Sequence, residues 1–435
     1  GLGDLSLAVA DEGNEISLRD FAHNAAGFLR DSDSWVIESW MSGNTQQIDR
    51  RALSSERRFG NAGVEVVQRS PGRALGAVVN WTYYEQSDNP GDWAKVRGPV
   101  ASALINQQFG AITIGALVGR ETENEDRISE DFFSLMHKQS RWVGQLGMAY
   151  DMAGWTIAGA WDFERGGVEA FSVDPARFHE DEFIWTRPLD RYSVAVLMPS
   201  GGTIEGGVRA AFMDREGGEK VKLSWSDRSP MNPSGSNFFE DAVTFEESES
   251  ESEILTQWRL HLGETMLSAE GAYRTWETEV REGINFKGSR REGASEESGV
   301  TFAAGASHRL LAGRLLVGAE GRVSQSDWEV STVTDLTEAT SQTGSIRAGV
   351  EYFIGASVAI RGGGFYGATD RDIDAPESLA RLQGVSGGFS WLPSGGLVQV
   401  HGSLGYLRQE PWDDDAGDIE EIEETSYRLG LRLLL

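Results

Sequence analysis

The sequence predicts an all-β protein: a closed antiparallel transmembrane β-barrel of about 18 strands, within a range of about 16 to 20. Two observations support this prediction. Apolar and polar residues alternate along many short segments, and these segments come in pairs joined by tight turns rich in glycine and proline. Longer polar stretches separate the pairs, so we expect short periplasmic turns at one end of the barrel and long extracellular loops at the other.

The last ten residues show the alternation most clearly. Tyr427, Leu429 and Leu431 occupy one face of a strand, and Arg428 and Arg432 occupy the other. A soluble sheet would cover its apolar face with a second layer of the same chain, but no amphipathic helical segment is available to do so. A soluble β-sandwich core is the alternative. The ending resembles the C-terminal signal of bacterial outer-membrane barrels, an aromatic residue followed by alternating apolar residues. This resemblance implies the outer membrane of a Gram-negative bacterium, with membrane lipid and lipopolysaccharide around the barrel.

The composition agrees with a barrel. Glycine (53 residues) and tryptophan (14) are frequent, proline (11) is scarce, and no stretch of about 18 apolar residues could cross a bilayer as a helix. The chain has no cysteine, which rules out disulfides, thiolate metal sites and a CxxCH haem attachment. Its net charge of −29 argues against binding to nucleic acid, because a polyanion would be repelled.

Eight tight turns predict eight hairpins, and one further strand at each end brings the total to 18. The turns are Ser70-Pro71-Gly72, Phe109-Gly110, Met152-Ala153-Gly154, Pro199-Ser200-Gly201-Gly202, Gly263-Glu264-Thr265, Leu311-Ala312-Gly313, Ile354-Gly355 and Pro393-Ser394-Gly395-Gly396.

The polar stretches between these hairpins are interpreted as loops. Two of them contain acidic runs without a base, 240–253 (EDAVTFEESESESE) and 413–424 (DDDAGDIEEIEE). The predicted loops lie near 43–59, 85–96, 120–140, 165–187, 214–253, 277–298, 324–343, 367–381 and 408–424.

Aromatic residues near the strand ends predict an interfacial girdle. The candidates are Trp35, Trp40, Trp81, Tyr83, Trp142, Trp155, Trp161, Trp258, Trp276, Trp391, Tyr406 and Tyr427.

If the apolar face meets lipid, the other face lines the lumen. Arginine dominates this face, and only five of the 39 basic residues of the chain are lysine. Arginine binds carboxylates through two parallel hydrogen bonds, which suits partly desolvated charges. The predicted lumen-lining residues are Arg191, Arg209, Arg259, Arg274, Arg314, Arg322, Arg347, Arg361, Arg428 and Arg432, with the acids Asp162, Glu164, Glu205, Glu270, Glu320 and Glu351.

Two interpretations of this wall remain open. Arginine and glutamate on neighbouring strands can form ladders that brace a wide barrel. Alternatively, the arginines form a basic path that draws anions inward, which predicts a porin-like channel for passive or facilitated transport of small anionic solutes. A third possibility is a scaffold that holds a partner protein in its lumen or at its rim, of the secretion-associated or porin-cytochrome type.

Residues 1–33 precede the first predicted strand and carry seven acids against two arginines. We expect this segment to form a plug or a periplasmic segment, with the barrel over 34–435. Its stretches 2–3 (LG), 8–12 (AVADE) and 24–28, with Asn24, Ala25, Ala26, Gly27 and Phe28, resemble the N-terminal region of the long-chain fatty-acid transporter (FadL-like) superfamily. Alanine replaces the proline of that motif, and about 18 strands exceed the number typical of the superfamily. The resemblance implies uptake of hydrophobic compounds as another function.

Other sites are weaker. Asp370, Asp372 and Asp374 have the alternating spacing of a calcium loop but lack the glycine that an EF-hand needs, so a solvated acidic run is the simpler interpretation. The six histidines show no ligand spacing, and no nucleophile elbow, phosphate loop or HExxH motif occurs. We therefore expect no catalytic residue and no cofactor apart from calcium in the acidic loops.

Overall fold

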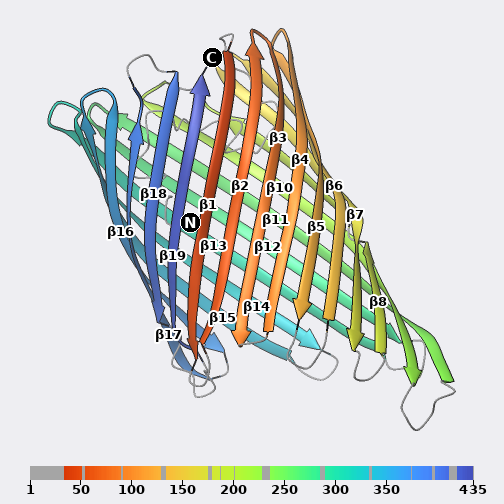
Figure 1. Ribbon diagram of the computed structural model, residues 1–435. Coiled ribbons are helices and arrows are strands. Elements are labelled where there is room, and N and C mark those ends of the chain that lie inside the picture. Colours follow the sequence, from red (N-terminus) through yellow and green to blue (C-terminus); the bar gives the residue numbers. More distant parts are fainter. Residues whose placement is uncertain are drawn as a thin grey trace.

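The computed structural model describes residues 34–434 except 51–53, 90–91, 129–133, 175–178, 187, 200, 228–235, 285–289, 333–335, 374, 394–396 and 411–418. These residues form one antiparallel sheet of 19 strand segments (Figure 1). The segments are β1 (Ser34–Arg50), β2 (Ser54–Ser70), β3 (Arg73–Asn89), β4 (Asp92–Phe109), β5 (Ile112–Ile128), β6 (Ser134–Met152), β7 (Trp155–Asp174), β8 (His179–Thr186), β9 (Leu189–Leu197), β10 (Ile204–Asp227), β11 (Ser236–Leu262), β12 (Thr265–Ile284), β13 (Arg290–Leu310), β14 (Leu315–Thr332), β15 (Leu336–Ile354), β16 (Val358–Ile373), β17 (Ala375–Trp391), β18 (Val398–Glu410) and β19 (Ile419–Leu434).

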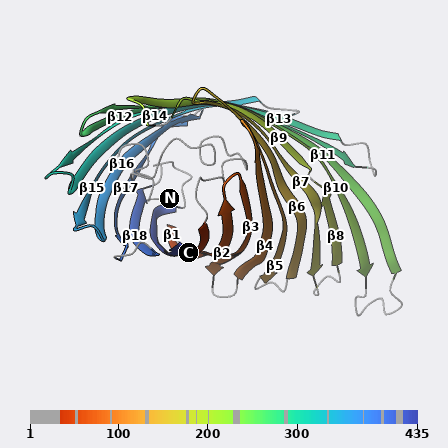
Figure 2. The same cartoon turned by 90° about the horizontal axis from the view of Figure 1, so that it is seen from above.

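The sheet closes on itself. Each strand pairs with the strands before and after it, and β1 also pairs with β19, from Val36 opposite Leu434 to Arg50 opposite Ile419. Seen along the barrel, β18, β1 and β2 follow one another where the two ends of the wall meet (Figure 2). Closure leaves no sheet edge, which is the condition for a β-structure to sit in lipid without unpaired backbone groups.

Segments β8 and β9 together form a single strand of the wall, so the barrel has 18 strands, as the sequence predicts. Both segments lie between β7 and β10, and their pairings keep one register on either side of the break. The break contains Pro188, which has no backbone N–H to donate to the ladder. Nearby, the Arg165 guanidinium donates a hydrogen bond to the Leu189 carbonyl oxygen (2.8 Å).

All eight predicted turns connect neighbouring strands, and all lie at the same end of the barrel as Ser34 and Leu434. At the turn between β6 and β7, Ala153 (φ 53°) and Gly154 (φ 88°) both have positive φ, the conformation of two-residue hairpin turns whose twist matches the flanking strands. Parts of two turns, Ser200 and 394–396, lie outside the described residues.

The predicted long loops are wrong in extent, because most of their residues belong to strands. The acidic stretch 240–253 lies entirely within β11, and 43–59 is strand except for 51–53, which lie outside the described residues. Of the run 413–424, residues 419–424 are strand and the rest lie outside the described part. Continuous cross-strand pairing, such as that of β11 with β12 from Val243 to Leu262, explains why polar residues here remain in the ladder.

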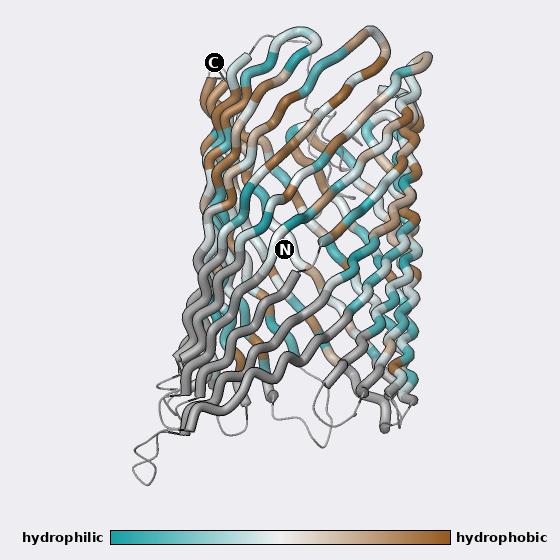
Figure 3. Tube along the Cα trace, turned by 90° about the vertical axis from the view of Figure 1, so that its right-hand side faces the viewer, coloured by the Kyte–Doolittle hydropathy of each residue, from teal (hydrophilic) through white to brown (hydrophobic). Residues whose placement is uncertain are grey.

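Hydrophobic residues gather toward the short-turn end, as the hydropathy colouring of the chain trace shows (Figure 3), and many large apolar side chains are exposed. Phe302, Ile346 and Leu404 are each at least 61% exposed. Because no second layer of the described residues covers them, these side chains form an apolar belt around the barrel. Among the described residues, no helix is long and apolar enough to cross a membrane.

Candidate functional site

The inner wall of the barrel is the candidate functional site. Side chains that alternate with the apolar belt face the lumen, and in β9 and β10 the inward residues are the more buried ones: Ala195, Leu197, Glu205 and Arg209 are all at most 8% exposed. On these two strands, the alternation of inward and outward residues therefore agrees with the sequence pattern.

β11 contributes a row of carboxylates to this wall. The sequence Glu247 to Glu253 (ESESESE) alternates along the strand, so glutamates face the lumen and serines face outward. The inward glutamates meet arginines on neighbouring strands. Their ion pairs are Arg209 with Glu253, Arg191 with Glu253 (3.6 Å), Arg274 with Glu251 (2.9 Å) and Arg215 with Glu249 (3.0 Å).

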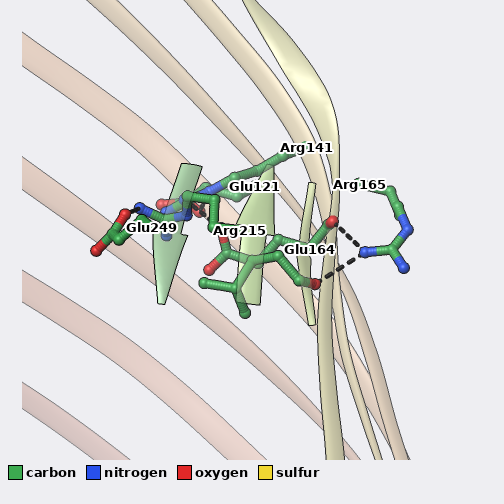
Figure 4. A network of polar contacts seen from close by, with 7 residues as sticks. Glu121, Arg141, Glu164, Arg165, Arg215 and Glu249 are labelled. Atoms are coloured by element: carbon green, nitrogen blue, oxygen red, sulfur yellow. Dashed lines mark hydrogen bonds and ion pairs between the residues drawn. The ribbon is translucent and has the colours of Figure 1, made fainter. Parts of the chain in front are cut away.

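A second chain of ion pairs crosses β5, β6 and β7. Arg141 lies between Glu121 and Glu164, and its Nη1 atom is 2.8 Å from the Glu164 Oε2 atom. Figure 4 shows this chain beside Arg215 and Glu249, with Arg165 on the opposite side of the wall. The outward Arg165 pairs instead with Asp190 (2.7 Å), which also accepts a hydrogen bond from Trp161 Nε1 (2.8 Å).

Further ladders lie near the short-turn end. Glu351 is 1% exposed and accepts a hydrogen bond from Arg361 Nε (2.5 Å), and Glu270 pairs with Arg322 (2.9 Å). Arg259 lies directly opposite Glu205, whose carboxylate is 3.4 Å from His261 Nε2. Arg347 lies directly opposite Glu320.

The bracing interpretation therefore describes at least half of the ten predicted arginines, since five of them pair with a carboxylate: Arg191, Arg209, Arg274, Arg322 and Arg361. Ionic ladders of this kind hold neighbouring strands in register, and a paired arginine presents little net charge to a passing ion.

Three predicted arginines differ from this set. Arg314 lies in the turn between β13 and β14, at the end of the wall rather than within a strand, and is exposed. Arg428 and Arg432 lie on the inward face of β19, as predicted, and among the described residues neither forms an ion pair. The Nε atom of Arg432 is buried without a hydrogen-bond partner in that part of the chain.

Sequence reasoning missed several wall residues because their segments were assigned to loops. This group contains Glu121, Arg215 and the glutamates of β11, and Arg141 directly follows the predicted loop 120–140. A signal was present: the strict Glu-Ser alternation of 247–253 has the period of two that marks a strand, although it contains no apolar residue.

Two girdle candidates also face inward. Trp40 lies opposite Gly63 on the lumen side and donates a hydrogen bond to Asn61 Oδ1 (3.0 Å). Trp276 lies opposite Glu251, and the Arg274 guanidinium carbon is 5.8 Å from the centre of its ring. Other candidates, such as Trp81, Trp142 and Trp391, are exposed on the outer face.

The remaining candidates lie largely beyond what the structure describes. The motif residues Asn24, Ala25, Ala26 and Gly27 and the whole predicted segment 1–33 are outside the described residues. Asp370 and Asp372 belong to β16 rather than to a loop, and Asp374 is outside. No group of three His, Asp or Glu residues that could hold a metal ion occurs in the described part.

The chain is a large closed antiparallel β-barrel whose inner wall carries ionic ladders. No family model and no curated protein sequence matches it. Similar solved structures include the RagAB peptide transporter (TM-score 0.54, 7% identity, 94% of this chain and 87% of that chain), the ferric citrate transporter FecA (0.48, 9%, 93% and 79%) and the CymD monoaromatic hydrocarbon channel (0.36, 12%, 100% and 96%). At 7% identity, the likeness to the peptide transporter concerns the fold alone.

Proposed function

We propose that this barrel lies in the outer membrane of a Gram-negative bacterium and forms a channel for small anionic solutes. Barrels of 16 to 18 strands are wide enough to leave an aqueous channel. The observation that carries the anion preference is the contrast on the inner wall: the ladder arginines are paired, whereas Arg428 and Arg432 have no ion pair among the described residues. Arg428 in particular lies between two serines, Ser42 and Ser403, and a lumenal cation without a neighbouring carboxylate raises the local concentration of anions.

Planar-bilayer recordings in a KCl gradient test this function. We expect a conductance whose reversal potential indicates chloride preference, and we expect the double change Arg428→Gln and Arg432→Gln to reduce the permeability ratio about twofold or more. Arg314→Gln removes a charge from an exposed turn and serves as the control, which should leave the ratio unchanged. Equal ratios in the double variant and the control would contradict the role of the two arginines.

We further propose that residues 1–33 act as a plug. Their excess of acids supports this role, because an acidic segment suits a lumen that contains Arg428, which has no carboxylate directly opposite it. Deletion of 1–33 should raise conductance. A barrel that conducts neither with nor without this segment would refute the channel. Recovery of a stoichiometric partner protein from native membranes would then favour the scaffold, and transport of a hydrophobic compound would favour the FadL-like function.

A further inference from the structure

The seam where β1 and β19 close the barrel carries a distinct patch on its lumen side. Two cross-strand rows cross β1, β19 and β18 there. One row is Trp40, Gly430 and His401, and the next is Ser42, Arg428 and Ser403. We call these two rows the seam patch.

Two planar rings cover the first row. Trp40 lies over Gly63 on the adjacent strand β2, and His401 lies over Gly430, so closely that a Cβ atom on either glycine would collide with the ring. Glycine at these two positions lets the rings lie against the backbone. The indole is fixed further by its hydrogen bond to Asn61. Each ring therefore offers a flat surface against the wall, the indole over β2 and the imidazole over β19. We call these two surfaces the platform, because aromatic molecules associate with such rings by offset stacking.

The second row has the composition of an oxyanion site. Arg428 is exposed to the lumen, and its direct neighbours on both sides are serines rather than carboxylates. A guanidinium and two hydroxyl groups supply donors for a carboxylate. The nearest acids by register each lie two rows from Arg428: Glu38 is opposite Arg432, and Glu424 is on β19 and accepts a hydrogen bond from Asn44 Nδ2 (3.0 Å). Arg361 of the same neighbourhood is paired with Glu351.

We propose that the seam patch binds aromatic carboxylates. This inference rests on the proposed channel and names the class of solute that its lumen recognises. Rows on one face of a strand are about 7 Å apart, so a ring on the Trp40 and His401 platform places its carboxylate beside Arg428. An aliphatic acid can pair with the arginine, but the platform adds nothing to its affinity. A neutral aromatic compound can stack on the platform, but the arginine adds nothing to its affinity.

Isothermal titration of the full-length protein in detergent tests the proposal without requiring conductance, so it stands apart from the bilayer test. Benzoate should bind more tightly than acetate, inorganic phosphate or benzyl alcohol. Arg428→Gln should weaken benzoate binding at least about tenfold. The control Arg322→Gln removes the same charge from a ladder arginine and should change benzoate binding less than about threefold.

Trp40→Leu separates the platform from the charge. This variant should weaken the binding of benzoate about threefold to tenfold and leave the binding of acetate unchanged. If this variant does not fold, His401→Asn removes the other ring and carries the same expectation. Equal affinities of the wild type for benzoate and acetate would overturn the platform, and equal effects of Arg428→Gln and Arg322→Gln would overturn the assignment of the anion to Arg428.

Discussion

The two halves of the barrel share one hydrogen-bond ladder but differ in what their outer faces meet. Toward the short turns, the outer face carries large apolar side chains such as Phe302 and Ile346. Further along the same strands, the outer face carries a row of exposed glutamates. These glutamates lie directly opposite one another across β12 to β15: Glu277, Glu296, Glu329 and Glu338. The difference teaches that the sheet, once closed, continues beyond the region that suits lipid.

Strand length supports this division. A strand crosses a bilayer with about 9 to 11 residues, whereas β11 has 27 and β10 has 24. The apolar belt accounts for one crossing, and the remaining residues extend the wall into water. In this extension the side chains no longer need to be apolar, and the backbone remains paired because the neighbouring strands are equally long.

Reversing the alternation of β11 should have the largest effect on stability. A variant in which residues 248–253 (SESESE) become ESESES keeps composition and net charge but turns the glutamates outward. Arg191, Arg209, Arg215 and Arg274 would lose their carboxylates. We expect a loss of more than about 3 kcal/mol of unfolding free energy, measured by urea unfolding in detergent. An unchanged midpoint would mean that this stretch behaves as a solvated loop.

A matched pair of arginine substitutions on one face of β15 tests the boundary between the two halves. Ile346→Arg places a charge in the apolar belt and should cost about 2 to 4 kcal/mol if that position lies near the bilayer midplane. Glu338→Arg lies eight residues away on the same outer face, in the polar extension, and should be neutral or slightly stabilising. Unfolding of both variants in lipid vesicles measures the two changes in unfolding free energy. Equal losses of unfolding free energy would contradict a lipid-facing belt that is limited to the half of the barrel near the short turns.

The smallest effect is expected within the glutamate row. Glu296 lies directly opposite both Glu277 and Glu329, and like charges in such positions repel. Glu296→Gln should therefore stabilise the barrel by about 0.2 to 1 kcal/mol at low salt. The gain should shrink as salt is added, because the groups are exposed. A gain independent of salt would point to a cause other than charge repulsion.

The sequence by itself determined the architecture. Apolar alternation and glycine-rich turns gave the eight hairpins, the number of wall strands and the inward position of Arg428 and Arg432, since these depend on a local period of two and on local turn chemistry. It did not determine where strands end, because the polar extensions lack the apolar signal on which strand prediction depends. The girdle prediction also fails for Trp40 and Trp276, which lie on the lumen side.

Only the tertiary structure decided which charges meet. Arg361 and Arg428 look alike in sequence, each at an inward position of a strand. Register places Glu351 opposite Arg361 but places serines on both sides of Arg428. The register between strands distant in sequence, above all that of β1 with β19, follows from closure of the whole barrel. No local pattern encodes this long-range pairing. The pairing distinguishes an arginine that braces the wall from an arginine that is accessible to a solute.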